Sequence, residues 1–465
     1  MSFEIYLKEN YKKSTTILVF LILVIYFFIA THGTLKFGQA VYAYSYYNVL
    51  ASGFAQGKIE MPYPVPKGLL ALKNPYDPID NFPFRNSGYQ DLSLYKNKLY
   101  LYFGPTPVVV LYLPLFYFFS GYNLPAGLAN FIFMSGTLIF AVLLISYLRK
   151  IYFKNVPVWL EFFVILVLAF ANMAPFLIYI PAIYQIAIAC DCFFLTGAVY
   201  FLCRAANKES LNYLFLGSLF LGLSVGARFY FLSSAIILIA FFCAVVLRQK
   251  NRFTFLKLLS LIGPFLFCLM MLMFYNYIRF ENIFETGNHY QLTGFLSRAG
   301  IENIIPNLYT YLLNPVTVNC QFPYLSLHQW HPRTYIREAV EKFAGLFYGV
   351  PFILISSLLF FKNDILNTQT QNHEKTPFPF TEFIIISIPA FINFVSLLAY
   401  QYVNMRYLAD FLTLWLLLNI IVLFYFDSSL SNGNRFKTYI RFSGILSGLL
   451  SIIFGIGFMF RIYGN

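Results

Sequence analysis

The stretch NPYDPIDNFPFRNSGYQDLSLYKNKLYLYFGPTP, from Asn74 to Pro107, is the least membrane-like part of the first half of the chain. It follows the first apolar segment and holds three of the chain's few carboxylates, Asp77, Asp80 and Asp91. The apolar segments on either side can be explained by lipid alone, whereas a polar, proline-rich loop dense in Asp, Asn and Tyr has no packing reason to have this composition. We therefore interpret the stretch as a functional loop.

The composition of the whole chain indicates a membrane protein. Of its 465 residues, 59% are hydrophobic and only 11% are charged, which leaves too little polar surface for a water-soluble globule of this size. The net charge of +13 comes from short basic clusters between apolar runs. This pattern is typical of the positive-inside bias and argues against nucleic-acid binding. Most cysteines lie in apolar runs, so no disulfide framework is implied.

The apolar runs predict an all-α polytopic membrane protein with about 11–12 transmembrane helices and two large outer loops. The first run reads as a retained signal anchor, and the lysines before it place the N-terminus in the cytoplasm. Basic clusters after residues 147, 203 and 247 fall on that same face, which makes the loops 32–104 and 278–342 external. There the two loops could meet over the helices. The runs are at about 17–30, 105–120, 124–147, 157–180, 183–203, 211–226, 229–247, 255–277, 343–361, 382–400, 407–426 and 440–460.

Two segments of the front half leave alternatives open. The run at 105–120 is short and holds three prolines, and the region 105–147 must cross the membrane an odd number of times. Two explanations follow. Either this run is re-entrant or lies on the membrane surface, which we favour, or one of the basic clusters faces outward. Residues 39–60 have tyrosines at helical spacing and predict an amphipathic helix on the membrane surface or a soluble cap helix. We divide the chain into a transmembrane module at 1–277, which includes the outer loop 32–104, the second outer loop at 278–342 and C-terminal helices at 343–465.

Motifs of soluble enzymes are absent from the sequence, which has no GxGxxG, P-loop, CxxC pair or HExxH. His328 and His331 in HQWH have a spacing compatible with metal ligation, but no third ligand is evident. The sequence gives no support for a divalent metal, and we predict no cofactor.

A few charged residues in or near the outer ends of the predicted spans point to a site. Asp191 is a carboxylate within a span, which is costly and is usually functional or paired. Arg228 in GARFY, Arg279 in YNYIRFENIFETG and Arg406 in NMRYLAD each lie where a span begins or ends. The undemanding explanation for such arginines is contact with lipid headgroups. The sharper one is that some of them converge on a phosphate, whose oxygens a guanidinium matches bidentately.

Four short stretches carry a resemblance to a known group of enzymes: DLSLYKNKLYLYFGPTPVVVLYLP, GLSVGARFYFL, NYIRFENIFETGNHYQLTG and MRYLADF. They resemble bacterial multi-spanning proteins of the GT-C glycosyltransferase superfamily, similar to protein O-mannosyltransferases and the lipid A aminoarabinose transferases. The resemblance implies a helical-bundle enzyme whose large first outer loop carries an acidic catalytic residue. It also implies a polyprenyl-phosphate sugar donor that is made on the inner face and presented on the outer face.

In one respect the chain departs from that pattern. Many relatives carry an Asp-Asp or Asp-Glu pair just after the first span, whereas this chain reads FGQAVYAYSYYN there, with no acid. The catalytic role therefore falls to Asp91 or Asp77. We predict a hexosyl- or pentosyltransferase that moves a sugar from a polyprenyl-phosphate donor to a lipid, glycan or protein acceptor. The expected location is the outer face of the bacterial inner membrane.

The chemistry of such a transfer suggests which residues do the work. A carboxylate must take or orient the acceptor proton, and positive charge must stabilise the leaving phosphate. Asp91 is the first choice because tyrosines suited to sugar stacking surround it, and Asp77 is the second; the alternative for both is that they cap turns. Arg228 and Arg406 are the candidate phosphate-binding cations. The predicted substrate-binding residues are Arg85, Tyr89, Tyr102, Asp191, Arg228, Glu285, Tyr290, Gln291, Arg406, Tyr407 and Asp410.

Two other classes of protein fit part of the pattern. A multi-spanning transporter or flippase of lipid-linked saccharides would have about as many spans, but internal repeats and broken helices with inward charges would be expected. An O-antigen ligase-like or polymerase-like enzyme would carry its large outer loop late in the chain, whereas here the first loop is long. We therefore favour the transferase.

Overall fold

The computed structural model shows a bundle of long helices with two small β-hairpins. It is 72% helical, which confirms the predicted all-α polytopic class. It describes residues 4, 7, 9–38, 45–85, 89, 91–208, 210–248, 253–293, 299–322, 324–328, 342–367 and 376–461. Within these residues, eight helical segments are long and apolar enough to cross a membrane. They contain α2 (Tyr11–Ala30), α6 (Ala126–Tyr152), α9 (Ile183–Asn207), α11 (Leu232–Arg248), α12 (Thr254–Phe280), α16 (Phe380–Leu398), α17 (Ala409–Ser429) and α18 (Arg435–Arg461).

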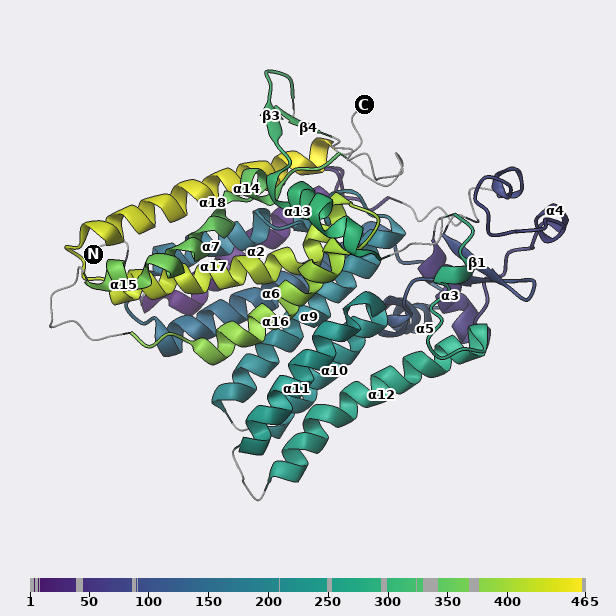
Figure 1. Cartoon of the computed structure of the whole chain (residues 1–465), viewed down its shortest axis with the longest axis horizontal. Helices are drawn as coiled ribbons and strands as arrows, with labels where there is room; N and C mark the ends of the chain where they lie inside the picture. The colour runs from purple at the N-terminus through teal and green to yellow at the C-terminus, as the bar shows by residue number, and fades with distance from the viewer. Residues whose placement is uncertain are drawn as a thin grey trace.

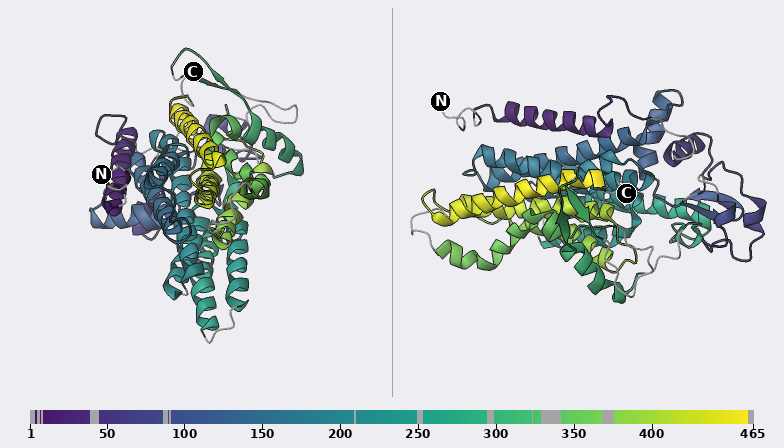
Figure 2. Two further views of the ribbon diagram at one scale, coloured as in Figure 1. Left: turned by 90° about the vertical axis from the view of Figure 1, so that its left-hand side faces the viewer. Right: turned by 90° about the horizontal axis from the view of Figure 1, so that it is seen from above.

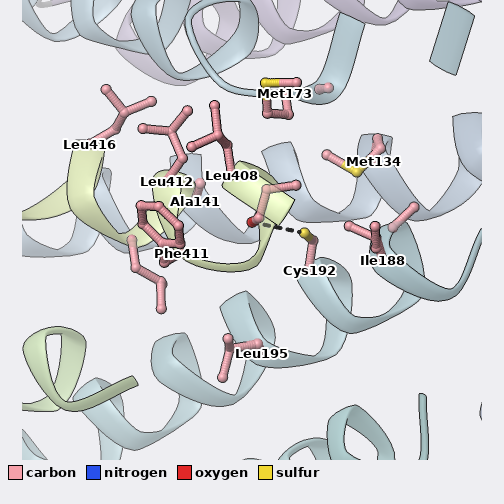
Figure 3. Packing of buried hydrophobic residues seen from close by; sticks show 14 of the residues in the cluster. Met134, Ala141, Met173, Ile188, Cys192, Leu195, Leu408, Phe411, Leu412 and Leu416 are labelled. Carbon is pink, nitrogen blue, oxygen red and sulfur yellow. Dashed lines mark hydrogen bonds between the residues drawn. The ribbon is translucent and has the colours of Figure 1, made fainter. Parts of the chain in front are cut away.

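The core of the bundle lies around α9 and α17, which are the most buried of these eight, with 89% of the apolar window of each buried. Figure 3 shows Cys192 of α9 beside Phe411 of α17, with the Cys192 thiol donating to the carbonyl of Ala409 at 3.3 Å. Small residues allow close approach elsewhere. A Cβ on Gly222 of α10 (Leu211–Ala227) would lie 2.5 Å from the Cβ of Cys268 of α12. The fit of small side chains against larger ones, rather than contacts between polar groups, therefore determines how these helices pack.

Several predicted runs form shorter or broken elements. The run at 157–180 divides into α7 (Val158–Phe170) and α8 (Ala174–Tyr179), and the run at 343–361 forms α14 (Leu346–Gly349) and the tighter helix η8 (Pro351–Phe361). The run at 105–120 contains only η4 (Val108–Tyr112) and α5 (Leu113–Phe118). Eleven helical residues extend roughly 16 Å, about half of a bilayer core of about 30 Å. This length agrees with the re-entrant or surface-lying interpretation.

The helix predicted at 39–60 is shorter and more buried than expected. Residues 39–44 lie outside the described residues, and α3 covers Tyr46–Ala55, with seven of its ten residues buried. It packs against η4 and α5. The side-chain amide of Asn48 donates to the Leu124 carbonyl at 2.9 Å and accepts from the Leu124 amide at 2.8 Å. The tyrosine spacing therefore marks a face that packs against protein, and the choice between a helix on the membrane surface and a cap helix stays a prediction.

The rest of the first outer loop is built around a hairpin that the sequence did not predict. Strands β1 (Leu92–Tyr95) and β2 (Lys98–Leu101) are antiparallel and are joined by Lys96 and Asn97. Both turn residues have positive φ, 45° and 59°, as a two-residue type I′ turn requires. The loop also holds α4 (Lys67–Leu70) and η2 (Phe82–Phe84).

The second outer loop has η6 (Asn288–Tyr290), η7 (Ile301–Asn303) and α13 (Ile304–Leu313), followed by the hairpin of β3 (Val316–Val318) and β4 (Leu325–Leu327). Its first part crosses to the first loop. The Leu292 amide donates to the Leu92 carbonyl at 3.0 Å, and the Ser93 hydroxyl donates to the Gly287 carbonyl at 2.7 Å. The prediction that the two loops meet is therefore confirmed.

The first outer loop lies at one end of the bundle, and the N-terminus lies at the other (Figure 1), beside the turn between α6 and α7, where the Val158 amide donates to the Glu4 carboxylate at 2.9 Å. Figures 1 and 2 show the β1 hairpin and α4 at the end away from the N-terminus, and Figure 1 places α15 (Lys362–Asn367) near the N-terminus. This is the arrangement expected if the two ends face opposite sides of a membrane.

Candidate functional site

A cavity of about 360 Å³ lies where the two loops meet the outer ends of the helices. Its size is within the usual range for small-molecule sites. Its walls come from six segments far apart in the sequence: residues 91–104, the start of α9, the junction of α10 with η5 (Phe229–Phe231), the end of α12, residues 286–293, and residues 396–407, which include η9 (Met405–Leu408).

Among the described residues that line this cavity, Asp91 is the only carboxylate. Its side chain accepts hydrogen bonds from the hydroxyl of Tyr184, the hydroxyl of Thr293 at 3.1 Å and the amide of Gln291 at 3.3 Å. The Thr293 hydroxyl also accepts from the Asp91 backbone amide at 3.1 Å. Asp91 has a φ of +59°, a left-handed conformation that Asp tolerates better than most residues. The carboxylate is therefore held from two other segments, the start of α9 and residues 291–293, in a backbone conformation of the kind that clusters at functional sites.

Burial raises the proton affinity of the Asp91 carboxylate. The side chain is only 9% exposed, and loss of solvation raises the pKa of its carboxyl above the usual value. The hydrogen bonds from Tyr184, Thr293 and Gln291 and the charge of Arg406 act in the opposite direction and lower the pKa. A carboxylate with a raised pKa is a stronger base than an ordinary aspartate, which suits it to taking a proton.

Two arginines share the cavity wall with Asp91, and each is fixed by its neighbours. A nitrogen of Arg228 lies 3.1 Å from an Asp410 oxygen in a buried ion pair, and its guanidinium lies 5.5 Å from the centre of the Tyr407 ring. The Arg406 guanidinium lies 4.4 Å from the centre of the Tyr184 ring. These two guanidinium groups therefore share the cavity wall with the Asp91 carboxylate, and Arg279 at the end of α12 adds a third.

The turn that presents Arg228 depends on glycine. Helix α10 ends at Ala227, and Arg228 adopts an extended conformation before η5 begins. Gly104 of the first loop lies directly against this turn, because a Cβ added to Gly104 would be 2.0 Å from the carbonyl oxygen of Gly226. A side chain at Gly104 would separate the loop from the helix end and displace both cavity walls.

Aromatic side chains form much of the rest of the wall, among them Tyr102, Tyr184, Tyr400 and Tyr407. The Tyr400 and Tyr407 rings lie edge to face at 6.0 Å, and Phe103 lies edge to face with Tyr184 at 5.3 Å. Burial raises the pKa of Tyr102 well above its usual value, so its phenol stays neutral. Rings that present both a face and a hydroxyl suit a ligand with apolar faces and polar edges, such as a sugar.

The structure brings eight of the predicted residues into or directly behind the cavity. The cavity is lined by Asp91, Tyr102, Arg228, Gln291, Arg406 and Tyr407. Asp410 lies behind the wall as the partner of Arg228, and Asp191 is fully buried and accepts a hydrogen bond from Ser224. The predicted intramembrane carboxylate therefore belongs to the support of the site and not to its surface.

The structure does not bring Asp77 or Arg85 to the cavity. The Asp77 carboxylate accepts from the backbone amides of Ile79 at 2.8 Å and Asp80 at 3.4 Å, which is the turn-capping role that was its alternative. The Arg85 guanidinium donates to the Pro78 carbonyl at 2.8 Å within the same loop. Both side chains shape the tip of the loop.

Tyr89, Glu285 and Tyr290 also lie outside the cavity wall. The Tyr89 hydroxyl donates to the Pro64 carbonyl. The Glu285 carboxylate accepts from the Gly287 amide at 2.6 Å and contacts the His289 ring at 2.5 Å, so it closes its own turn. Tyr290 stacks on the rings of Tyr95 and Phe280. The sequence placed these residues in the right loops, but their side chains hold the loops together.

The structure shows no group of three metal-binding side chains within the described part of the chain. His331 of the HQWH motif lies outside the described residues. The ring of His328 contacts the hydroxyl of Thr317.

Residues that the sequence did not single out complete the site, above all Tyr184, Thr293, Tyr400 and Tyr402. Tyr184 follows Pro181 at the start of α9, where a phenol faces the outer end of the bundle. The position of Tyr184 at the start of a span could have identified it from the sequence. Thr293 could not have been identified in this way, because its contact with Asp91 depends on the meeting of two loops.

Comparisons with known proteins give a limited match. No protein-family model and no curated protein matches the chain. Among solved structures it is similar to the oligosaccharyltransferase AglB of Archaeoglobus fulgidus, in complex with an inhibitory peptide and a dolichol-phosphate, at 13% identity and a TM-score of 0.47, over 99% of this chain and 57% of that one.

The apo form of the Archaeoglobus fulgidus oligosaccharyltransferase matches with 13% identity and a TM-score of 0.43, over 96% of this chain and 56% of that one. The chain thus spans just over half the length of the structures it matches. Both of these structures are described as oligosaccharyltransferases.

Proposed function

We propose that this chain is a GT-C-type glycosyltransferase that moves a sugar from a polyprenyl-phosphate donor to a hydroxyl acceptor. One observation carries the proposal: Asp91, Arg228 and Arg406 line one aromatic-walled cavity at the end of the bundle away from the N-terminus. A base, a phosphate-binding pair of cations and a sugar-stacking wall are the groups that such a transfer needs.

The roles follow from the contacts. The acceptor hydroxyl gives its proton to Asp91 as its oxygen bonds to the anomeric carbon of the donor. The bond between that carbon and the phosphate oxygen breaks, and polyprenyl phosphate leaves with the electron pair. Arg406 and Arg228 stabilise the negative charge that grows on the phosphate. The rings of Tyr102 and Tyr407 hold the sugar.

The membrane setting is part of the proposal. The basic turn between α6 and α7 lies at the end of the bundle that holds the N-terminus (Figure 1), which the positive-inside bias places in the cytoplasm. The cavity would then open on the outer face of a bacterial inner membrane. A donor anchored by its polyprenyl chain would reach the cavity from the outer leaflet.

The test is a transfer assay with purified protein in proteoliposomes. Radiolabelled polyprenyl-phosphate sugars are supplied with lipid, glycan and peptide acceptors, and label on the acceptor and free polyprenyl phosphate are measured together. We expect both products to appear in equal amounts. Passage of intact donor across the bilayer, with no cleavage of the sugar–phosphate bond, would instead identify a flippase and refute the proposal.

The pH dependence of transfer should report the Asp91 carboxyl. Because protonated Asp91 cannot accept a proton, activity is expected to fall as the pH drops through its raised pKa. The Tyr184 hydroxyl stabilises the carboxylate and lowers this pKa, so Tyr184→Phe should move the acid limb of the pH–rate profile to higher pH. The plateau at alkaline pH should change by less than about tenfold, because the carboxylate itself remains. An acid limb that moved to lower pH, or stayed in place, would contradict this role.

A further inference from the structure

Arg279 is a third arginine on the cavity wall, and the proposed transfer does not use it. It lies near the end of α12, is 3% exposed and lines the cavity. Its guanidinium lies 4.0 Å from the centre of the Tyr275 ring and 4.7 Å from that of Phe280. It donates to the Leu101 carbonyl at 2.6 Å and to the side-chain oxygen of Asn276 at 2.7 Å. The side chain is therefore fixed in place.

The charge of Arg279 lacks the counter-charge that its counterpart has. Arg228 pairs with Asp410, but no carboxylate of the described residues forms a salt bridge with Arg279. Its Nε is buried and has no hydrogen-bond acceptor. Glu285, an acid of the adjoining loop, acts on the charge of Arg279 but forms no salt bridge with it, and its carboxylate is bonded to Gly287 and to His289. A buried cation without a paired anion is costly, and an anion from outside would remove that cost.

Polar side chains accompany Arg279 on the cavity wall. Asn276 lies one turn earlier on α12, and Thr286 and Asn288 come from the second loop. Leu101, whose carbonyl accepts from Arg279, pairs across the hairpin with Leu92, the residue next to Asp91. The guanidinium and the proposed base are therefore attached to the same pair of strands.

We propose that Arg279 and Asn276 form a second anion subsite in the cavity, for a phosphate or carboxylate of the substrates other than the phosphate held by Arg228 and Arg406. The inference rests on the proposed function, which it deepens by naming a substrate class. The second anion has two sources with the same chemistry. It is the second phosphate of a diphosphate donor, or it is an acidic group on the acceptor.

Two variants separate anion binding from a structural role. Arg279→Gln removes the charge but keeps an N–H donor for the Leu101 carbonyl. Asn276→Asp leaves Arg279 intact and places a carboxylate where the amide oxygen now lies, 2.7 Å from the guanidinium. If Arg279 only ties α12 to β2, Asn276→Asp should lower the melting temperature of the ligand-free protein, through loss of the hydrogen bond that the amide donates to the Ile283 carbonyl, and leave phosphate binding unchanged. If Arg279 binds an anion, this internal carboxylate should occupy the subsite and block it.

The experiment measures binding to full-length protein in detergent micelles, by ligand-dependent change in melting temperature and by intrinsic fluorescence. The probes are undecaprenyl phosphate, undecaprenyl diphosphate, and inorganic phosphate with and without saturating undecaprenyl phosphate. We expect wild type to bind a second phosphate, either as a preference for the diphosphate or as inorganic phosphate added to the lipid-saturated protein. Both variants should weaken that second binding about 10- to 100-fold, as loss of a charge-assisted contact does, and should leave undecaprenyl phosphate binding unchanged.

The pattern of results shows whether the second anion belongs to the donor or to the acceptor. A diphosphate preference that both variants abolish places the anion on the donor, and Arg279-dependent binding of inorganic phosphate beside the lipid places it on the acceptor. The subsite is refuted if wild type shows neither effect, or if Asn276→Asp retains the effect in full. Failure of wild type to bind undecaprenyl phosphate counts against the proposed function instead. The lipid-free phosphate titration then still decides the subsite by its dependence on Arg279.

Discussion

Replacing Asp91 by asparagine is expected to lower the rate of sugar transfer by about 10²- to 10⁴-fold, the usual contribution of a positioned general base. Asparagine keeps the shape of the side chain and an oxygen that can accept from Thr293 and Gln291. The Tyr184 hydroxyl can turn to accept from the new amide. The variant therefore loses the base while it keeps the cavity, and donor binding should remain close to that of wild type.

The matched control is Asp77→Asn, in the same outer loop. The Asp77 carboxylate accepts only from backbone amides of its own turn and does not line the cavity. We expect this variant to retain transfer within about threefold, since a capping contact is worth roughly 1 kcal/mol of stability and nothing in the reaction. If Asp77→Asn abolished transfer and Asp91→Asn did not, the site assignment would be wrong.

Replacing Arg406 by glutamine is expected to lower kcat by about 10²- to 10³-fold, with a smaller change in KM, because the positive charge acts mainly on the phosphate as it leaves. Lysine should recover only part of the rate. The Arg406 guanidinium is planar and lies 4.4 Å from the Tyr184 ring centre, and an ammonium reproduces neither the stacking nor a bidentate contact with phosphate.

The control for Arg406 is Arg85→Gln. Arg85 also belongs to the outer end of the molecule, but it donates to the Pro78 carbonyl and does not line the cavity. Transfer kinetics and melting temperature are measured for both variants. Equal losses in the two would mean that net charge near the membrane, and not a specific phosphate contact, is what matters. Loss confined to Arg406→Gln supports the assignment.

Much of this fold could be predicted because lipid imposes a simple rule on sequence. A span needs about 20 apolar residues and leaves its positive charges on one side, so the long helices and the meeting of the two loops at one end of the bundle could be inferred. The rule fails where a segment is apolar because it packs against protein and not against lipid. The tyrosines of α3 are buried among other elements at the outer end, and a pattern of apolar residues does not distinguish protein from membrane as the partner.

The site was predictable to the extent that a residue's type and position along a span carry information. Arg228 and Arg406 stand out because a guanidinium beside a run of apolar residues is rare. Asp91 and Asp77 could not be separated, since both lie in one polar loop. What separates them is Thr293, which bonds the Asp91 side chain and backbone from 202 residues away. A contact of that range leaves no local trace in the sequence.

The same contact bears on how the protein is made. Asp91 emerges early in synthesis, Thr293 only after α12, and Arg406 later still, just ahead of α17. During translation the ribosome must therefore deliver most of the polypeptide to the insertion machinery before base and cations share one chamber. A nascent chain that ends before residue 293 lacks both Thr293 and Arg406, so the cavity forms only late in synthesis.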